Sequence, residues 1–256
     1  MDLHTALHYS PLAFMVFVAG FIDAMAGGGG LVTLPAYLAN GVSPFLLLGT
    51  NKLSSSMGTV VAAAKFLKEV RFKADFLFLV VFAAAAGALL GARAVTLAPP
   101  ELIHYMLIVC LPPIAVFLLW HRKFGIADTS SAHSEGKLLA RTAGIAFGVS
   151  FYDGMLGPGT GTFLAIGFAR FCGFDLLRST ALAKVINLSS NVFSLGAFLY
   201  FGRVNVWLGA AMGLAGMAGN YAGSHLALKK GAWIIRPMLL VICASLLGKI
   251  AWDMLK

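Results

Sequence analysis

Charged residues are scarce in this chain. Only 11% of its 256 residues are Asp, Glu, Lys or Arg, while 59% are hydrophobic and the mean hydropathy is +0.87. A soluble domain carries about 25% charged residues, so this shortage excludes an ordinary soluble protein. The composition predicts a polytopic membrane protein that contacts the lipid bilayer through spans of about 20 residues each.

Cysteine pairs and catalytic motifs are also missing. Cys110, Cys172 and Cys243 are isolated in apolar sequence, so we expect them to pack and not to form a disulfide framework or a metal site. No G-x-S-x-G, H-E-x-x-H or C-x-x-C occurs, and the glycines at 27–30 lack the Gly-Lys-Ser/Thr of a phosphate loop. The sequence therefore predicts no enzyme, no cofactor and no metal.

The formal net charge is +9, yet no basic stretch alternates with aromatic residues. Nucleic-acid binding is therefore not predicted. Cytoplasmic loops of membrane proteins collect Lys and Arg, which accounts for the excess of positive charge. The first apolar run has no basic flank before it and no small-residue cleavage site ahead of Gly27. We expect this run to be retained and not removed as a signal peptide.

Eight apolar stretches follow one another along the chain. They cover 11–39, 45–67, 76–97, 102–120, 138–171, 176–201, 206–228 and 233–255. The first and fifth are long and interrupted by glycine, and the other six have the length of a single span. A polar, turn-rich segment lies between the fourth and the fifth. We expect a first membrane repeat over 1–120, a polar cytoplasmic linker over 121–137 and a second membrane repeat over 138–256.

The two interrupted stretches share the pattern Asp-x-x-x-Gly-x-Gly. It begins at Asp23 in the first stretch and at Asp153 in the second, 130 positions later. Glycines hold a helix poorly and an acid inside the bilayer is costly, so each segment should break and expose its backbone there. Interrupted, acid-bearing segments in corresponding places of two halves are typical of the binding site of a secondary transporter.

The correspondence continues beyond this pattern, which indicates an internal repeat. At an offset of 132 positions, Lys52 matches Lys184 and Gly87-x-x-x-Gly91 matches Gly219-x-x-x-Gly223. Small residues at this spacing let helices approach closely in lipid. We expect these glycine pairs to pack helices, either within one chain or between the chains of a homo-oligomer.

The distribution of Lys and Arg residues indicates how the two sequence halves are oriented in the membrane. If each glycine-broken stretch enters and leaves the membrane on the same side, most Lys and Arg residues outside the spans lie on one side of the membrane. If every stretch crosses the membrane once, one side has only a small excess of Lys and Arg. The positive-inside rule therefore favours an all-α polytopic fold of two inverted repeats with both termini outside. Each repeat has three full transmembrane helices and one glycine-broken, re-entrant or discontinuous, element. A broken helix that crosses fully in each half would instead give parallel repeats.

Asp23 and Asp153 are the candidate coupling residues. An ionised carboxylate in the bilayer interior must be paired, hydrated or protonated. The functional interpretation is a site that couples transport to a proton or another cation. The structural interpretation, which is favoured, is a carboxylate that caps free N–H groups at the break or neutralises a lysine.

Lys52 and Lys184 each lie well inside an apolar segment and begin a stripe of small polar groups at helical spacing. The candidate substrate-binding side chains are those of Lys52, Asn51, Ser55 and Ser56 in the first stripe and of Lys184, Asn187 and Asn191 in the second. Two such stripes that meet at a pseudo-two-fold axis would form one cationic pocket for a small anionic substrate.

Helices that restart after the glycine breaks would direct free N–H groups at this pocket, which favours an anion. The candidate backbone donors are Gly28, Gly29 and Gly30 in the first break and Gly159, Thr160 and Gly161 in the second. The alternative is that each lysine pairs with one aspartate, giving two neutral internal salt bridges. Anion binding is favoured because the hydroxyl and amide groups exceed what pairing alone needs.

Four segments together resemble a known family. They are Gly20–Gly30 followed by Leu34-Pro35, then Thr50–Leu53, Gly148–Gly161 and Ala183–Asn191. The chain resembles the TauE/SafE family of membrane transporters, also called the sulfite and organosulfonate exporter or TSUP family, over essentially its whole length. The resemblance implies a multi-pass permease of the bacterial cytoplasmic (inner) membrane that moves sulfur-containing oxyanions such as sulfite, sulfonates or sulfoacetate by a secondary mechanism.

The resulting hypothesis is a carrier for a small sulfur oxyanion, coupled to a proton or another ion, that works by moving one half against the other. The alternative is a passive anion channel in which the same pocket acts as a selectivity constriction. A membrane scaffold without transport would need large exposed loops, and the longest linker, 121–137, is short.

Overall fold

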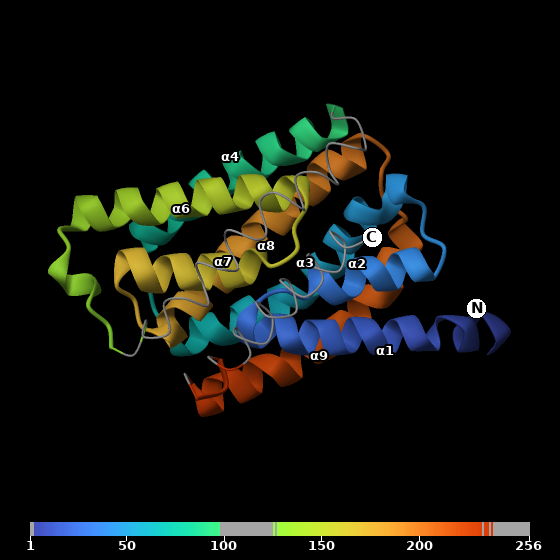
Figure 1. Ribbon diagram of the computed structural model, residues 1–256, viewed down its shortest axis with the longest axis horizontal. Helices are drawn as coiled ribbons and strands as arrows, with labels where there is room; N and C mark the ends of the chain where they lie inside the picture. The colour runs from blue at the N-terminus through green and yellow to red at the C-terminus, as the bar shows by residue number, and fades with distance from the viewer. Residues whose placement is uncertain (1–2, 98–124, 126, 232, 236, 238–256) are drawn as a thin grey trace, which may run out of the picture.

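The computed structural model describes residues 3–97, 125, 127–231, 233–235 and 237, with side chains from residue 9 onward. This part of the chain forms α-helices with one 3₁₀ turn and one π-helical turn, and contains no β-strand (Figure 1). The helices are α1 (Leu3–Ala26), α2 (Gly30–Ala39), α3 (Pro44–Glu69), α4 (Ala74–Leu97), α6 (Glu135–Met155), α7 (Thr160–Gly167), α8 (Leu176–Tyr200) and α9 (Val206–Lys230). The all-α prediction is thus confirmed for the described residues. The predicted stretch 102–120 and most of 233–255 lie outside them, as do Cys110 and Cys243.

Three helices in the described ranges are long and apolar enough to cross a membrane. They are α4, α8 and the Tyr9–Ala26 part of α1. α3, α6 and α9 have similar lengths, between 21 and 26 residues, but none of them has a stretch of span length that is as apolar. α2 and α7 have only 10 and 8 residues. At about 1.5 Å per residue, each reaches about half of the hydrocarbon core or less, so neither crosses a membrane by itself.

Large apolar side chains cover the outside of the helices. Phe14, Phe78, Phe82, Tyr200 and Trp207 are each between 66% and 88% exposed. Soluble monomers rarely expose so much aromatic surface, because water solvates it poorly. Lipid accommodates such a surface, which agrees with the spans.

Both predicted helix breaks are present. Residues 27–29 separate α1 from α2, and residues 156–159 separate α6 from α7. Gly27 and Gly157 take left-handed conformations, with φ of +77° and +91°, which residues with a Cβ atom rarely adopt. After each break the chain turns back, so that α2 packs along α1 and α7 along α6 (Figure 1). Gly27 of the first break packs directly against Gly161 at the start of α7, just after the second break.

The two sequence halves do not form separate bundles. α9, from the second half, packs on α1 and α3, whereas α4, from the first half, packs on α6 and α8 (Figure 1). We call α1, α2, α3 and α9 the first bundle, and α4, α6, α7 and α8 the second bundle. The two bundles meet mainly where α3 packs against α8. A movement of one sequence half against the other, as the sequence suggested, would have to pull the exchanged helices apart.

The predicted glycine pairs explain this exchange. A Cβ atom on Gly91 in α4 would overlap the carbonyl oxygen of Phe151 in α6, and a Cβ atom on Gly223 in α9 would overlap that of Phe21 in α1. The other glycine of each pair makes an equivalent contact one turn earlier. The helices therefore approach each other closely enough for backbone to touch backbone. The observed role of the glycine pairs is helix packing within one chain.

Corresponding helices of the two halves run in opposite directions. α1 and α6 are antiparallel, as are α3 and α8, and α4 and α9 (Figure 1). The segment before α6 is attached to the second bundle, because the Thr129 N–H donates to the Gly173 carbonyl at 2.7 Å. Asp128 pairs with Arg178 of α8, with Oδ2 and Nη1 2.6 Å apart. α6 begins at Glu135, slightly before the predicted end of the linker.

Candidate functional site

The four predicted charged residues meet at the contact between the bundles and pair crosswise. Lys52 Nζ of α3 lies 2.6 Å from Oδ2 of Asp153 in α6. Lys184 Nζ of α8 lies 2.9 Å from Oδ2 of Asp23 in α1. Each ion pair joins the first bundle to the second, and each joins the two sequence halves. The alternative of two internal salt bridges is therefore what the structure contains.

The Asp153 carboxylate is enclosed by donors. Besides Lys52, its Oδ1 accepts a hydrogen bond from the Thr160 hydroxyl at 2.7 Å, and its Oδ2 accepts one from the Ser190 hydroxyl. Lys52 in turn donates to Oδ1 of Asn191 at 3.0 Å. Only 2% of the Asp153 side chain is exposed. Three donors thus stabilise this buried negative charge.

Asp23 has fewer hydrogen-bond partners than Asp153, and its side chain is more exposed. Its Oδ1 accepts the backbone N–H of Gly29 at 3.2 Å, and Lys184 contacts both its Oδ2 and its backbone carbonyl. The Asp23 side chain is 14% exposed. The Gly29 N–H was predicted as a donor for an anion, but here the carboxylate caps it. The structural interpretation offered two roles for this carboxylate, and Asp23 has both: it caps the break and neutralises a lysine.

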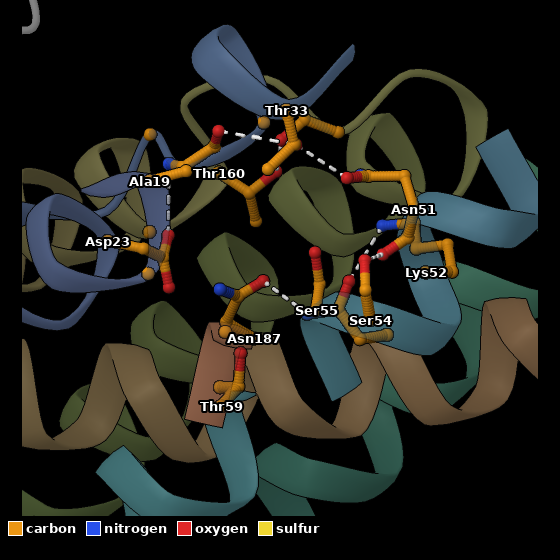
Figure 2. A pocket seen from close by; sticks show the side chains of 18 of the residues that line it. Ala19, Asp23, Thr33, Asn51, Lys52, Ser54, Ser55, Thr59, Thr160 and Asn187 are labelled. Carbon is orange, nitrogen blue, oxygen red and sulfur yellow. Dashed lines mark hydrogen bonds between the residues drawn. The ribbon is translucent and has the colours of Figure 1, made fainter. Parts of the chain in front are cut away.

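A polar cavity lies beside these ion pairs. The centre of a water-sized molecule can occupy about 40 Å³ of it. One water needs about 10–15 Å³ on this measure, so the space fits a small ion or a few water molecules. Figure 2 shows Asp23, Asn51, Lys52, Thr160 and Asn187 arranged around it. These side chains come from both bundles, so the cavity lies between them.

Most of the predicted site residues line this cavity. They are Asp23, Gly28, Gly29, Gly30, Asn51, Lys52, Ser55, Asp153, Thr160, Gly161, Asn187 and Asn191. Three others lie outside its wall. Lys184 is held at Asp23, the Ser56 hydroxyl donates to the Lys52 backbone carbonyl at 2.7 Å, and Gly159 forms the turn before α7. The two polar stripes therefore meet, although the two ammonium groups contact different carboxylates.

Sequence reasoning missed further polar residues of the wall, namely Thr33, Ser54, Thr59 and Asn220. The Thr33 hydroxyl donates to Oδ1 of Asn51 at 2.5 Å (Figure 2). Asn220 lies inside the second Gly-x-x-x-Gly pattern, so an amide in an otherwise apolar stretch was an available signal. Serine and threonine are common in membrane helices, so the hydroxyl residues carried no such signal.

The charges of the site sum to zero, because two aspartates face two lysines. Among the residues that the structure describes, no group of three or more His, Cys, Asp or Glu side chains is placed to hold a metal ion. Carboxylate, ammonium, amide and hydroxyl groups beside a polar cavity can bind small ions and exchange protons. Helix breaks, buried lysines and a polar cavity in an apolar bundle are features of a transport site.

One family model, described as "Sulfite exporter TauE/SafE", matches residues 12–250. The chain belongs to the TauE/SafE family. The resemblance inferred from the four sequence segments is therefore confirmed. As a TauE/SafE protein, the chain is a multi-pass membrane protein and a membrane transporter, not an enzyme.

Named TauE/SafE relatives are similar over nearly their whole length. "Probable membrane transporter protein ORF9" of a Sinorhizobium species is 37% identical over 250 residues, which covers 96% of this chain and 95% of that protein. "Probable membrane transporter protein YfcA" of Escherichia coli K12 is 35% identical over 242 residues, or 94% and 89% of the two chains. A Haemophilus influenzae "Probable membrane transporter protein" is 32% identical over 240 residues, or 93% and 92%. No solved structure matches significantly.

Proposed function

We propose that this TauE/SafE protein is a secondary transporter of small sulfur-containing oxyanions, such as sulfite or organosulfonates, coupled to protons and working by alternating access. The observation that carries the proposal is the polar cavity at the two helix breaks, lined by Asp23, Lys52 and Asp153. The family description as a sulfite exporter supports the substrate class. A site between two bundles suits alternate opening toward each side of a membrane.

Charge balance supports coupling to a proton. With both aspartates ionised and both lysines protonated, the site is neutral, and a monoanion entering it would leave a net negative charge inside the membrane. Such a charge is costly in a low-dielectric interior. One proton taken up by a carboxylate gives the empty site a net positive charge, which the anion then neutralises. The anion and the proton therefore bind together.

Asp23 is the carboxylate that takes this proton. Asp153 has three donors around it and is 2% exposed, whereas Asp23 has one lysine and one backbone N–H and is 14% exposed. Protonating Asp23 costs fewer charge-assisted hydrogen bonds. It also weakens the hydrogen bond between the Asp23 carboxyl and the Gly29 N–H, and Gly29 lines the cavity. This backbone donor becomes available to the anion at the moment when the charge balance allows it to bind.

The size of the cavity supports a small substrate ion. Its volume of about 40 Å³ suits an ion of a few heavy atoms. Amide groups of Asn51, Asn187 and Asn191 and the ammonium of Lys52 provide donors for the oxygens of such an anion. A sulfonate with a larger organic group requires the bundles to separate first. That separation breaks both ion pairs, because each connects the two bundles.

The membrane arrangement that we propose is two inverted repeats with both termini outside, in the bacterial inner membrane. The antiparallel course of corresponding helices and the reciprocal packing of α1 on α9 and α4 on α6 support the inversion. Basic residues lie together at the end of the helices where α4 and α6 begin. There Lys73 pairs with Glu135, and Arg178 lies over the ring of Phe72. The positive-inside rule assigns this end to the cytoplasm. Bacterial relatives support the location.

Sulfite uptake into proteoliposomes tests the proposal. Replacing Lys52 or Lys184 by Gln should abolish saturable flux, because each change removes a buried positive charge from the site. Lys73→Gln is the matched control, since its side chain is 77% exposed and lies away from the cavity. Undiminished flux in both buried-lysine variants would contradict the proposal.

Counterflow separates the carrier from a passive anion channel. A carrier that alternates between two faces exchanges labelled for unlabelled sulfite, so substrate on the far side accelerates the flux. A channel shows no such acceleration, because its path is open to both sides at once.

A further inference from the structure

A second hollow lies at the turn between α3 and α4, away from the ion pairs. We call it the α3–α4 hollow, and its wall consists of Leu67, Lys68, Val70, Arg71, Phe72 and Leu77. The centre of a water-sized molecule can occupy about 420 Å³ of it, compared with about 40 Å³ of the cavity between the bundles. None of its wall residues lines that cavity, so the two spaces are separate.

Two basic side chains of this wall have no partner. Four basic residues lie between positions 65 and 73, and two of them are already engaged. Lys65 donates to the Tyr221 carbonyl at 3.1 Å and lies over the ring of the same residue. Lys73 forms an ion pair with α6. The side chains of Lys68 and Arg71 make no hydrogen bond, ion pair or ring contact with any described residue. The charges that face the hollow are therefore the uncompensated ones.

The corresponding arginine of the second half has a structural role that Arg71 lacks. Arg203 lies 132 positions after Arg71. Its Nη2 donates to the Thr96 carbonyl at 3.1 Å, and its guanidinium lies 4.7 Å from the centre of the Phe45 ring. The position that corresponds to Phe45 is Leu177, which has no ring. Helix packing thus accounts for Arg203 but leaves Arg71 available to a ligand.

The charges around the hollow favour an anion. No acidic residue belongs to its wall. Glu69 and Asp75 are close in the sequence and exposed, but neither forms an ion pair with Lys68 or Arg71. Two positive charges on one concave surface attract a negative group. A guanidinium beside an ammonium suits a phosphate, because arginine can bind two of its oxygens at once while lysine adds a point charge.

The rest of the wall is apolar and consists of Leu67, Val70, Phe72 and Leu77. Leu67 is 36% exposed, and Phe78, next to Leu77 in α4, is 70% exposed. α4 is one of the apolar spans and begins at Ala74. The hollow therefore lies where the lipid-facing surface meets the basic end of the helices. A phosphate with an apolar tail fits this wall better than a soluble phosphate, which leaves the apolar side chains uncovered.

We infer that the α3–α4 hollow binds an anionic phospholipid, with Lys68 and Arg71 holding its phosphate and the apolar side chains contacting the start of its acyl chains. The positive-inside rule assigns this end of the helices to the cytoplasm, so the lipid belongs to the inner leaflet. The site lies outside the transport cavity. The inference therefore does not depend on which ion the protein carries, and it can fail while the proposed transport is confirmed.

Native mass spectrometry of the purified protein in detergent, with added lipid, tests the inference. Wild type should bind phosphatidylglycerol, which carries a net negative charge, about tenfold more tightly than zwitterionic phosphatidylethanolamine. Lys68→Gln and Arg71→Gln should each weaken phosphatidylglycerol binding about fivefold, and the double variant should weaken it about twentyfold. Both side chains are exposed, so these variants should fold. Equal affinities of wild type for the two lipids overturn the inference.

Lys73→Gln is the matched control. It removes one positive charge from the same end of the helices, but Lys73 is paired with Glu135 and lies outside the wall of the hollow. Its affinity for phosphatidylglycerol should change by less than about twofold. A loss as large as that of Lys68→Gln would mean that the basic end attracts anionic lipid diffusely, which contradicts a defined site.

Two further measurements separate charge and lipid from other causes. The swap Lys68→Arg/Arg71→Lys keeps both charges and should retain the affinity within about threefold. A loss equal to that of the double glutamine variant contradicts binding through charge. Glycerol 3-phosphate, which has the phosphate without acyl chains, should not displace phosphatidylglycerol at equal concentration. Displacement would identify a soluble phosphate compound as the occupant and overturn the assignment to a lipid.

Discussion

Lys184 and Asp23 lie 2.9 Å apart although 161 positions separate them in the chain. Lys52 and Asp153 form the complementary pair, so each half of the sequence neutralises the charge of the other. Neither half can bury its aspartate or its lysine alone without leaving an unpaired charge inside the membrane. The crossed pairing therefore makes correct assembly of the two halves a condition for stability, and it places both pairs where the bundles must separate during transport.

Asp153→Asn should destabilise the protein by about 3–5 kcal/mol, because it leaves Lys52 buried without its counter-charge. Thermal unfolding in detergent measures this. The double variant Lys52→Gln/Asp153→Asn should recover much of the loss, since it removes both charges. A double variant as unstable as Asp153→Asn would show that the carboxylate stabilises the fold through Thr160 and Ser190 and not through the pair.

Asp23→Asn should fold and should bind the anion, but its transport should no longer respond to a pH gradient. The amide mimics the protonated acid, so the site stays in the form that accepts an anion. Flux at several pH values on each side of the liposome membrane tests this. The exchange of labelled for unlabelled substrate should persist. Flux that follows the pH gradient as it does in wild type would exclude Asp23 as the coupling group.

Gly91→Ala should destabilise the protein by about 1–3 kcal/mol, because the new methyl meets the backbone of α6 at Phe151. Gly144→Ala in α6 is the matched control, since it is exposed and no atom lies within 4 Å of its Cβ position. Alanine favours a helix over glycine by about 1 kcal/mol, so the control should be neutral or stabilising. Equal unfolding temperatures for both variants would contradict close packing of α4 on α6.

The Asp128–Arg178 pair should stabilise the linker at neutral pH and not in acid. Burial would raise the pKa of Asp128, but hydrogen bonds from Ser130 and Arg178 outweigh it and hold the pKa below its ordinary value. A carboxyl with a lowered pKa stabilises the fold above its unfolded pKa of about 4, and the gain disappears as the pH falls through its folded pKa. The pair is partly exposed, so its contribution is about 1 kcal/mol or less.

Comparing Asp128→Asn with wild type measures this effect. The variant should be slightly less stable at neutral pH and equally stable in strong acid, where both side chains are uncharged. Unfolding temperatures across this pH range provide the measurement. A difference that grows toward acid would have the wrong sign for a carboxyl stabilised in its charged form.

Local chemistry made several parts of the structure predictable. The breaks at Gly27 and Gly157 follow from conformations that only glycine adopts readily, and the break pattern is visible in the sequence. The candidate pocket follows from polar groups that recur at helical spacing beside Lys52 and Lys184. These are properties of neighbouring residues, so no tertiary contact is needed to see them. Asn220 is only an amide in an apolar stretch of the sequence, because its place on the cavity wall depends on how α9 packs.

The amino-acid sequence by itself determined that this is an apolar helical membrane protein of the TauE/SafE family, with two broken segments and four buried charges. Only the tertiary structure decided how the charges pair, which helices of one half pack in the bundle of the other and which side chains line the cavity. The physical reason is distance along the chain. Hydrophobic length and backbone freedom act within a few residues, whereas a salt bridge or a cavity depends on side chains that folding brings together from more than 100 positions away.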